Sequence, residues 1–300
     1  MARADLHVHS KYSNHPTEWF LKRIGTSESY TEPEAIYAEA KARGMDYVTI
    51  TDHNSIEGAL LLHEAHPEDT FLGVESTAYF PEDRCKVHVL IYDFTEWQFN
   101  EIQKLRENIY ELTKYLKVQR LAHSLAHATY SIQGVLQADH IEKLTLLFDT
   151  FETINGGRNR RTNETLEAYF DELTEADIDF LADKHNIEPF SSTAWNKRYT
   201  GGSDDHAGLF IGRTYTEAAG DTTAEFLAEL REGSSVSGGR HHDFSSMAFS
   251  IFKIAYEFAK SKKSNFAGVP LRLMTDLAFG KRKLNLFEDM AINFLGRKKT

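Results

Sequence analysis

Histidines recur at short spacings in this chain, where strands are expected to end. His7 and His9 form a His-x-His pair in the apolar stretch 4–8. Because side chains alternate along a strand, both imidazoles lie on one face. Paired imidazole nitrogens suit Zn, Mn, Fe or Co. By itself the pair is a weak signal, since single histidines are more often ordinary buried or surface residues.

The same chemistry accumulates at other expected strand ends. The further candidates are Asp52 and His53 after 47–51, Glu75 in 70–76, His88 in 86–92, and Asp204 and His206 in a glycine-rich turn. A carboxylate inside an apolar strand is costly unless it is paired or bound to a metal. The set as a whole therefore predicts a metal site.

Strands and helices alternate along the chain. The stretches 4–8, 47–51, 70–76, 86–92 and 148–154 are predicted strands, and 31–44, 55–65, 96–116 and 162–185 are predicted helices. This alternation favours an α/β fold with a mainly parallel sheet. Functional residues at the carboxyl ends of many strands are typical of a closed (β/α) barrel.

The composition is that of a globular protein without a disulfide framework. The chain has 300 residues and a single cysteine, Cys85, which excludes a cysteine-rich zinc site and fits a reducing cytosol. No apolar run is long enough for a membrane span, and the first residues lack the apolar core of a signal peptide. We therefore expect a cytoplasmic protein.

The net charge of −11 divides unevenly along the chain. Residues 1–230 hold 21 Lys and Arg against 39 Asp and Glu, whereas 231–300 hold 13 against 6. We expect a body over 1–240 and a basic helical extension over 241–300. The extension could pack on the body, or contact a membrane, a nucleic acid or a partner chain. The acidic body argues against long nucleic-acid substrates.

The motifs, taken in order, resemble those of the PHP family, named for polymerase and histidinol phosphatase domains. They are DLHVHS at 5–10, TDHNS at 51–55, GVE at 73–75, KVHVLIY at 86–92, LAHATY at 125–130, FETINGG at 151–157 and GSDDH at 202–206. The resemblance covers about residues 1–240. It implies a distorted (β/α)7 TIM-like barrel and hydrolysis of phosphate esters by a hydroxide that bridges two metal ions.

The resemblance also implies a site for two or three divalent ions (Zn, Mn or Fe). The implied ligands are His7, His9, Glu75 and Asp204 for the first ion, Glu75, His88 and His127 for the second, and His15, His53 and His206 for the third. Asn14 is the alternative to His15, and His123 is the alternative to His127. The remaining histidines (His63, His66, His140, His185, His241 and His242) match no motif and are expected on the surface.

Catalytic roles follow from the same assignment. Glu75 would bridge two ions, and His206 would stabilise the leaving oxygen. Asp52 would either orient the imidazole of His53 or cap the end of a strand. Arg158, after FETINGG, is the first candidate to bind substrate phosphate, and Lys197 and Arg198 are the second.

The favoured function is a phosphoesterase acting on a small molecule such as a nucleotide or a sugar phosphate. The alternatives are a non-catalytic metal-bearing module and a nuclease acting on nucleic-acid ends. A histidinol phosphatase ranks lower, because no residue is identified that would recognise an imidazole. The presence of a residue able to bind metal at every implied position favours the enzyme.

Overall fold

The computed structural model describes residues 1–13, 27–132 and 134–241, and also 249, 250, 252–254, 256, 257 and 260. Asn14, His15, His242 and most of the basic extension lie outside the described residues. By contacts between Cα atoms the chain divides into two units, Met1–Ser250 and Ile251–Thr300. All helices and strands named below belong to the first unit.

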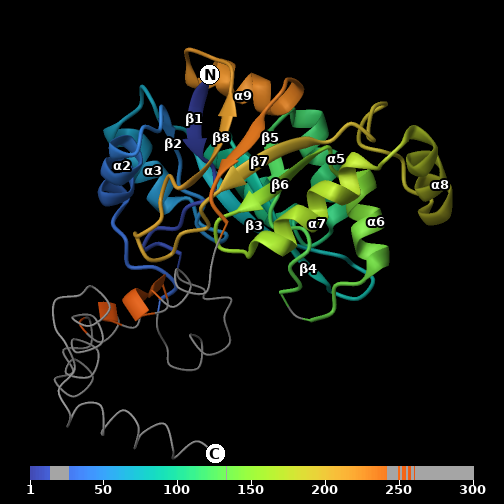
Figure 1. Ribbon diagram of the computed structural model, residues 1–300, viewed down its shortest axis with the longest axis horizontal. Coiled ribbons are helices and arrows are strands. Elements are labelled where there is room, and N and C mark those ends of the chain that lie inside the picture. Colours follow the sequence, from blue (N-terminus) through green and yellow to red (C-terminus); the bar gives the residue numbers. More distant parts are fainter. Residues whose placement is uncertain are drawn as a thin grey trace, which may run out of the picture. The chain divides into compact units, whose positions relative to one another are not determined.

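Helices and strands alternate over most of this unit (Figure 1). They are β1 (Ala2–Asp5), α2 (Pro33–Ala42), β2 (Tyr47–Val48), α3 (Glu57–Ala65), β3 (Gly73–Tyr79), β4 (Lys86–Tyr92), α4 (Glu96–Leu105), α5 (Ile109–Gln119), β5 (Ala122–Leu125), α6 (Ala138–Leu147), β6 (Thr150–Asn155), α7 (Arg160–Asp171), α8 (Glu175–His185), β7 (Arg198–Gly202), β8 (Thr214–Ala218), α9 (Thr223–Glu232) and β9 (Val236–Gly239). The predicted α/β class is confirmed.

The strands form two sheets, with the orders β2-β1-β8-β9 and β3-β4-β5-β6-β7. The neighbours β1–β2, β5–β6 and β6–β7 are parallel, whereas β1–β8, β3–β4, β4–β5 and β8–β9 are antiparallel. The prediction of a mainly parallel sheet is therefore wrong. The connection from β3 to β4 is too short for a crossover helix, so this pair must be antiparallel.

Isolated parallel bridges connect the two sheets. Val8, after β1, pairs with Asp205, after β7. His53, after β2, pairs with Glu75 of β3. In the described part of the chain, no continuous ladder closes the sheets into a barrel. The predicted (β/α)7 barrel thus stays a prediction.

Helices lie on more than one side of the sheets (Figure 1). Ile91 of β4 and Phe151 of β6 belong to one buried cluster with Leu116 of α5 and Phe170 of α7. Phe226 of α9 belongs to a second cluster with residues of β1 and β4, and residues of α2 and α3 belong to a third with Val8. Burial of these side chains stabilises the loops at the strand ends, where polar residues gather. In the described residues, no helix is long and apolar enough to cross a membrane.

Two predicted long helices are each broken into two. The stretch 96–116 forms α4 and α5, and the side chain of Asn108 caps α5 by accepting a hydrogen bond from the backbone N–H of Tyr110. The stretch 162–185 forms α7 and α8, and Thr174 caps α8 in the same manner. The buried residues Ile102, Ile109 and Leu116 continue the apolar spacing across the first break. A periodic pattern alone does not reveal such a break, whereas the capping residues do.

Candidate metal centre

The structure brings eight of the nine predicted ligands into one buried cluster. They are His7, His9, His53, Glu75, His88, His127, Asp204 and His206, and they form overlapping groups whose ligand atoms lie within 4.8 Å of one another. The ninth, His15, lies outside the described residues. Glu75 and His88 come from β3 and β4, and the others from segments that follow strands. The strands and the segments that follow them therefore place these side chains together.

Glu75 lies at the centre of the cluster and is 1% exposed. Its oxygens lie 2.6–3.2 Å from nitrogen atoms of five imidazoles: Oε1 faces His88 and His127, and Oε2 faces His7, His9 and His53. Each oxygen of the Glu75 carboxylate thus contacts a different set of imidazoles. This is the arrangement that a residue bridging two cations requires.

Asp204 adds a second carboxylate beside the His-x-His pair. Its Oδ1 lies 3.5 Å from Nε2 of both His7 and His9, and 3.6 Å from Nδ1 of His206. Asp204 has a φ of 50°, a left-handed conformation that is uncommon for residues other than glycine. The turn after β7 therefore holds Asp204 toward the cluster at a cost in backbone strain.

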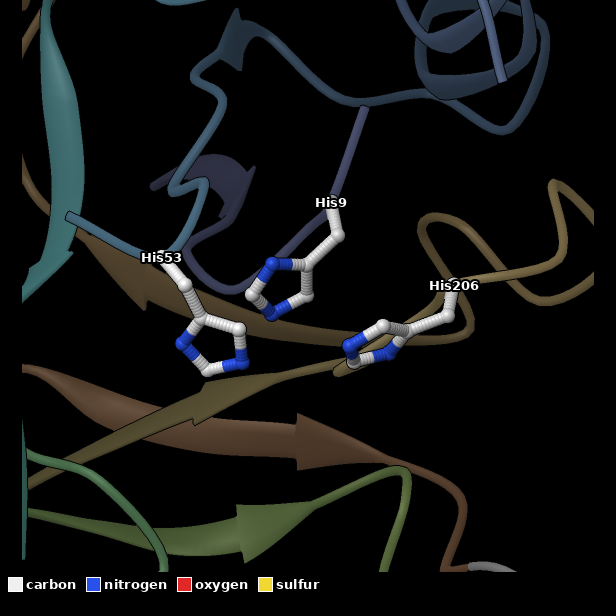
Figure 2. Close-up of side chains that lie close together, drawn as sticks. All are labelled: His9, His53 and His206. Carbon is white, nitrogen blue, oxygen red and sulfur yellow. The ribbon is translucent and has the colours of Figure 1, made fainter. Parts of the chain in front are cut away.

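Three imidazoles of the cluster, those of His9, His53 and His206, lie close together (Figure 2). The ring centroid of His9 lies 4.8 Å from that of His53 and 4.0 Å from that of His206. The three side chains come from different segments and point toward one another. His206 is the more exposed member, since 19% of its side chain is accessible. It therefore borders the opening to solvent.

Glu28 is a member of the site that the sequence analysis missed. It is buried, its Oε2 lies 3.3 Å from Nε2 of His53, and its Oε1 lies 3.4 Å from Nε2 of His206. The hydroxyl of Ser13 donates a hydrogen bond to it. Glu28 occupies the place beside His53 and His206 that the resemblance assigned to His15. No motif or periodicity distinguishes Glu28 from other glutamates in loops.

Several buried ligand atoms have no hydrogen-bond partner among the described residues. They are Nε2 of His7, His9 and His206, Nδ1 of His53 and His88, and Oε2 of Glu75. A buried polar atom without a partner costs about 1–3 kcal/mol. These atoms converge on one region, and imidazole nitrogens with carboxylate oxygens are suitable ligands for Zn, Mn or Fe. The residues present therefore fit a group of divalent cations.

Charges within the cluster are strongly coupled when no cation is bound. Burial opposes ionisation of Glu75, but the imidazoles His53, His88 and His7 outweigh it and hold the pKa of Glu75 well below its usual range. Burial also opposes protonation of His206, yet Glu28 and Asp204 raise its pKa to about 9. Burial lowers the pKa of His88 to about 4. Since a metal binds neutral imidazole, its binding must release protons from the histidines with raised pKa.

Glu152 lies in the FETINGG segment, and the sequence did not identify it as a site residue. Its Oε1 lies 2.9 Å from Nδ1 of His7, and its Oε2 accepts hydrogen bonds from the backbone N–H of His127 and from Nδ2 of Asn155. Asn155 also donates to Oδ2 of Asp204. Strand β6 thus orients three predicted ligands without supplying one, which is the usual role of outer carboxylates at metal sites. Its signal, a buried carboxylate in an apolar strand, was the same as that of Glu75.

Asp52 holds a loop rather than an imidazole. Its carboxylate accepts hydrogen bonds from the backbone N–H and the hydroxyl of Ser10, both at 2.6 Å. Asp52 is fully buried, and Ser10 directly follows His9. Asp52 therefore fixes the backbone next to a predicted ligand.

The turn after β7 approaches His7 so closely that only glycine fits at position 202. A Cβ atom on Gly202 would lie 2.7 Å from the backbone N of His7, which requires the two segments to separate. We expect Gly202→Ala to lower the free energy of unfolding by about 2–3 kcal/mol through this crowding, as measured by denaturant unfolding. Gly134→Ala is the control: its φ of 73° brings strain, but its Cβ would meet no atom within 4 Å. An equal or smaller loss in Gly202→Ala would contradict the close approach.

Of the two alternatives in the LAH segments, His127 lies in the cluster and His123 does not. The Nδ1–H of His123 donates to the carbonyl of Leu121, and its ring packs on Phe148 and Phe190. One of the expected surface histidines, His140, is in fact buried. It accepts a hydrogen bond from the backbone N–H of Gln137 at the start of α6 and contacts Asp83.

Arg158 lies at the edge of the cluster. Its Nη2 is 3.7 Å from Oδ2 of Asp204, and its guanidinium lies over the ring of Tyr130. Of the three predicted substrate-binding residues, it is the one that the structure brings to the site.

Lys197 and Arg198 lie at the opposite end of β7, about 20 Å from Asp204 at the usual rise per residue. Arg198 borders a pocket of about 140 Å³ together with His123, and it pairs with Asp149. Lys197 donates to the carbonyls of Thr145 and Phe148. The structure thus separates both residues from the cluster, because they lie at the start of the strand whose carboxyl end reaches it.

Burial lowers the pKa of Lys197 to about 7. The unfolded chain, with an ordinary lysine pKa, then binds more protons than the folded chain between about pH 7 and pH 10. We expect the free energy of unfolding to rise with pH across this window because of Lys197. Denaturant unfolding at several pH values should show that Lys197→Met loses this rise, whereas Lys114→Met, on an exposed residue of α5, keeps it. An unchanged slope in Lys197→Met would contradict the burial of a neutral amine.

Comparison with protein families gives a match over residues 191–235 to the family model described as PHP-associated. The match covers β7, β8 and α9, and it includes the turn that carries Asp204 and His206. It confirms, for this segment, the resemblance that the motifs indicated.

A curated relative, an uncharacterized protein of Methanocaldococcus jannaschii, is 45% identical over 58 residues, which are 19% of this chain. The match spans about a third of that relative, 32% of its length.

Solved structures with some likeness include three bacterial proteins. A protein named as a metal-dependent phosphoesterase from Bifidobacterium adolescentis has a TM-score of 0.40 and 14% identity, over 76% of this chain and 94% of that one. PsfC from Pseudomonas syringae has a TM-score of 0.48 and 14% identity, over 84% and 97%. An amidohydrolase from Chromobacterium violaceum, with bound sulfate and no metal, has a TM-score of 0.42 and 15% identity, over 68% and 87%.

Proposed function

We propose that this PHP-family chain is a metal-dependent hydrolase of phosphate esters on small molecules, such as a nucleotide or a sugar phosphate. The observation that carries the proposal is the convergence of buried imidazole nitrogens on Glu75, several of which have no hydrogen-bond partner among the described residues. Such atoms are costly in a site that never binds a cation.

Three groups of residues would hold the ions. They are His7, His9, Glu75 and Asp204 for the first, Glu75, His88 and His127 for the second, and His53, His206 and Glu28 for the third. Bound divalent cations would acidify a water molecule and neutralise charge on the phosphoryl oxygens.

Other residues of the chain would orient the ligands and bind the substrate. Glu152 accepts from Nδ1–H of His7 and so directs Nε2 of that ring into the site. A third ion held in part by His206 would stabilise the leaving oxygen, or His206 itself would do so where that ion is absent. Arg158 offers a planar guanidinium to the phosphate, and the hydrogen bonds of Asp52 hold Ser10 beside the site.

The acidic body favours a small substrate over a long nucleic acid. For the extension 241–300 we keep the proposal of contact with a membrane or a partner chain, and this segment lies largely outside the described residues. The alternative of a metal-bearing module without activity is separated from an enzyme by the experiment below.

The test is a screen of the metal-loaded protein for phosphate release from nucleotides, nucleoside bisphosphates and sugar phosphates. We expect turnover on at least one of these classes, and none after Glu75→Gln. Metal binding without any release of phosphate would favour the non-catalytic module. Release from oligonucleotide ends alone would favour the nuclease.

The third group of ligands can be tested through Glu28. We expect Glu28→Gln to bind one ion fewer per chain than the wild type, because a neutral amide is a poor ligand for these metals. Elemental analysis after dialysis measures the stoichiometry. Glu32→Gln, at a residue with 61% of its side chain exposed, should bind as many ions as the wild type. Full occupancy in Glu28→Gln, together with loss of an ion in His15→Gln, would assign the place to His15.

A further inference from the structure

The guanidinium of Arg158 lies beside the candidate metal centre without a close hydrogen bond to Asp204. Its Nη2 lies 3.7 Å from Oδ2 of Asp204, which is too long for a hydrogen bond. Its Nε is buried and has no hydrogen-bond partner among the described residues. A guanidinium at this position does not neutralise Asp204 by a close bidentate pair. Its donors remain available to an anion that enters the site.

The contact that holds this guanidinium is aromatic. Its central carbon lies 3.7 Å from the ring centroid of Tyr130, well within the range of a cation–π contact. The backbone N–H of Tyr130 donates to the carbonyl of His127 at 2.8 Å, so a tight turn fixes the backbone that carries the ring. The ring also stands edge-on to the imidazole of His127, with centroids 5.7 Å apart. Tyr130 thus joins Arg158 to a candidate metal ligand.

We propose that Tyr130 is a positioning residue that holds the guanidinium of Arg158 in place for the oxygens of a phosphate group, an inference that rests on the proposed function. An aromatic ring restrains the plane of a guanidinium without using its N–H donors. A carboxylate in the same place would use those donors and compete with phosphate. Replacing the ring by an aliphatic side chain frees the long arginine to adopt other rotamers, which weakens phosphate binding.

The test measures binding of inorganic phosphate to the metal-loaded protein by titration calorimetry. Tyr130→Leu should raise the dissociation constant about tenfold, the effect of a partly buried cation–π contact. Tyr130→Phe keeps the ring and should stay within about twofold of the wild type. Arg158→Met should bind at least as weakly as Tyr130→Leu, and adding Tyr130→Leu to Arg158→Met should have no further effect.

Two further readouts separate positioning from a general loss of structure. Elemental analysis should find the same number of ions in Tyr130→Leu as in the wild type, although Tyr130 contacts His127. With a substrate found in the screen, the variant should raise KM and leave kcat within about twofold. Loss of an ion in Tyr130→Leu would overturn the proposal in favour of a structural role beside His127.

The outcomes also distinguish this inference from the proposed function. Wild-type binding in Tyr130→Leu with weakened binding in Arg158→Met would reject Tyr130 and leave the hydrolase intact. Equal effects of Tyr130→Phe and Tyr130→Leu would assign the role to the hydroxyl and overturn the role of the ring. Failure of the metal-loaded wild type to bind phosphate or release it from any ester would reject both.

Discussion

We expect Glu75→Gln to lower the rate of phosphate release by at least about 10³-fold. An amide keeps the shape of the side chain but removes the charge that lies 2.6–3.2 Å from five imidazoles. A bridging cation site supplies several kcal/mol of transition-state stabilisation, and each 1.4 kcal/mol is a factor of ten in rate. Steady-state kinetics and elemental analysis measure the two consequences, loss of turnover and loss of bound ions.

The matched control is Glu107→Gln, on a glutamate with 51% of its side chain exposed that pairs with Arg84. This variant should keep both the activity and the metal content of the wild type. Circular dichroism should show that both variants are folded. A well-folded Glu75→Gln protein with near-normal turnover would remove the basis of the metal assignment.

Removal of the metal is the second change with a large expected effect. Treatment with a chelator should abolish hydrolysis, and Mn²⁺ or Zn²⁺ should restore it, because the donor set suits these ions. The metal-free protein should also unfold at a lower temperature. Ions that bind the folded chain add about 2.7 kcal/mol of stability at a concentration of 100 times Kd, and several of the buried nitrogens make no hydrogen bond within the described residues that would replace a bound ion.

The matched experiment uses His7→Ala/His9→Ala protein, which lacks the paired imidazoles. Chelator and added metal should shift its unfolding temperature less than that of the wild type. Full hydrolysis by protein shown to be metal-free by elemental analysis would contradict the proposed mechanism, even if the fold were confirmed.

The predicted ligands share a local cue, a polar residue within or directly after an apolar strand. His7, Glu75 and Asp204 all carry it, and the structure places all three in overlapping groups of one cluster. Glu152 carries the same cue but contacts His7, a predicted ligand, and belongs to none of these groups in the described residues. The cue therefore marks a buried polar residue, whereas a direct contact with a cation depends on distances that pattern alone does not contain.

The errors have equally physical causes. Lys197 directly precedes β7 and Arg198 is its first residue, and an extended strand separates such residues from its carboxyl end. The break between α4 and α5 follows from the cap at Asn108, which a long apolar spacing concealed. Glu28 is in a loop without periodicity, so nothing local separates it from the other acidic residues of the chain.

From sequence alone, the alternation of strands and helices determined the α/β class, and the residue types in and after the strands predicted a metal site of nitrogen and oxygen ligands. Only the tertiary structure decided the sheet topology, the approach of Glu28 to His53, and the stacking of Arg158 on Tyr130. The reason is the range of the interactions. Strand alternation and capping act over a few residues, whereas these contacts join segments far apart in the chain through the packing of the whole core.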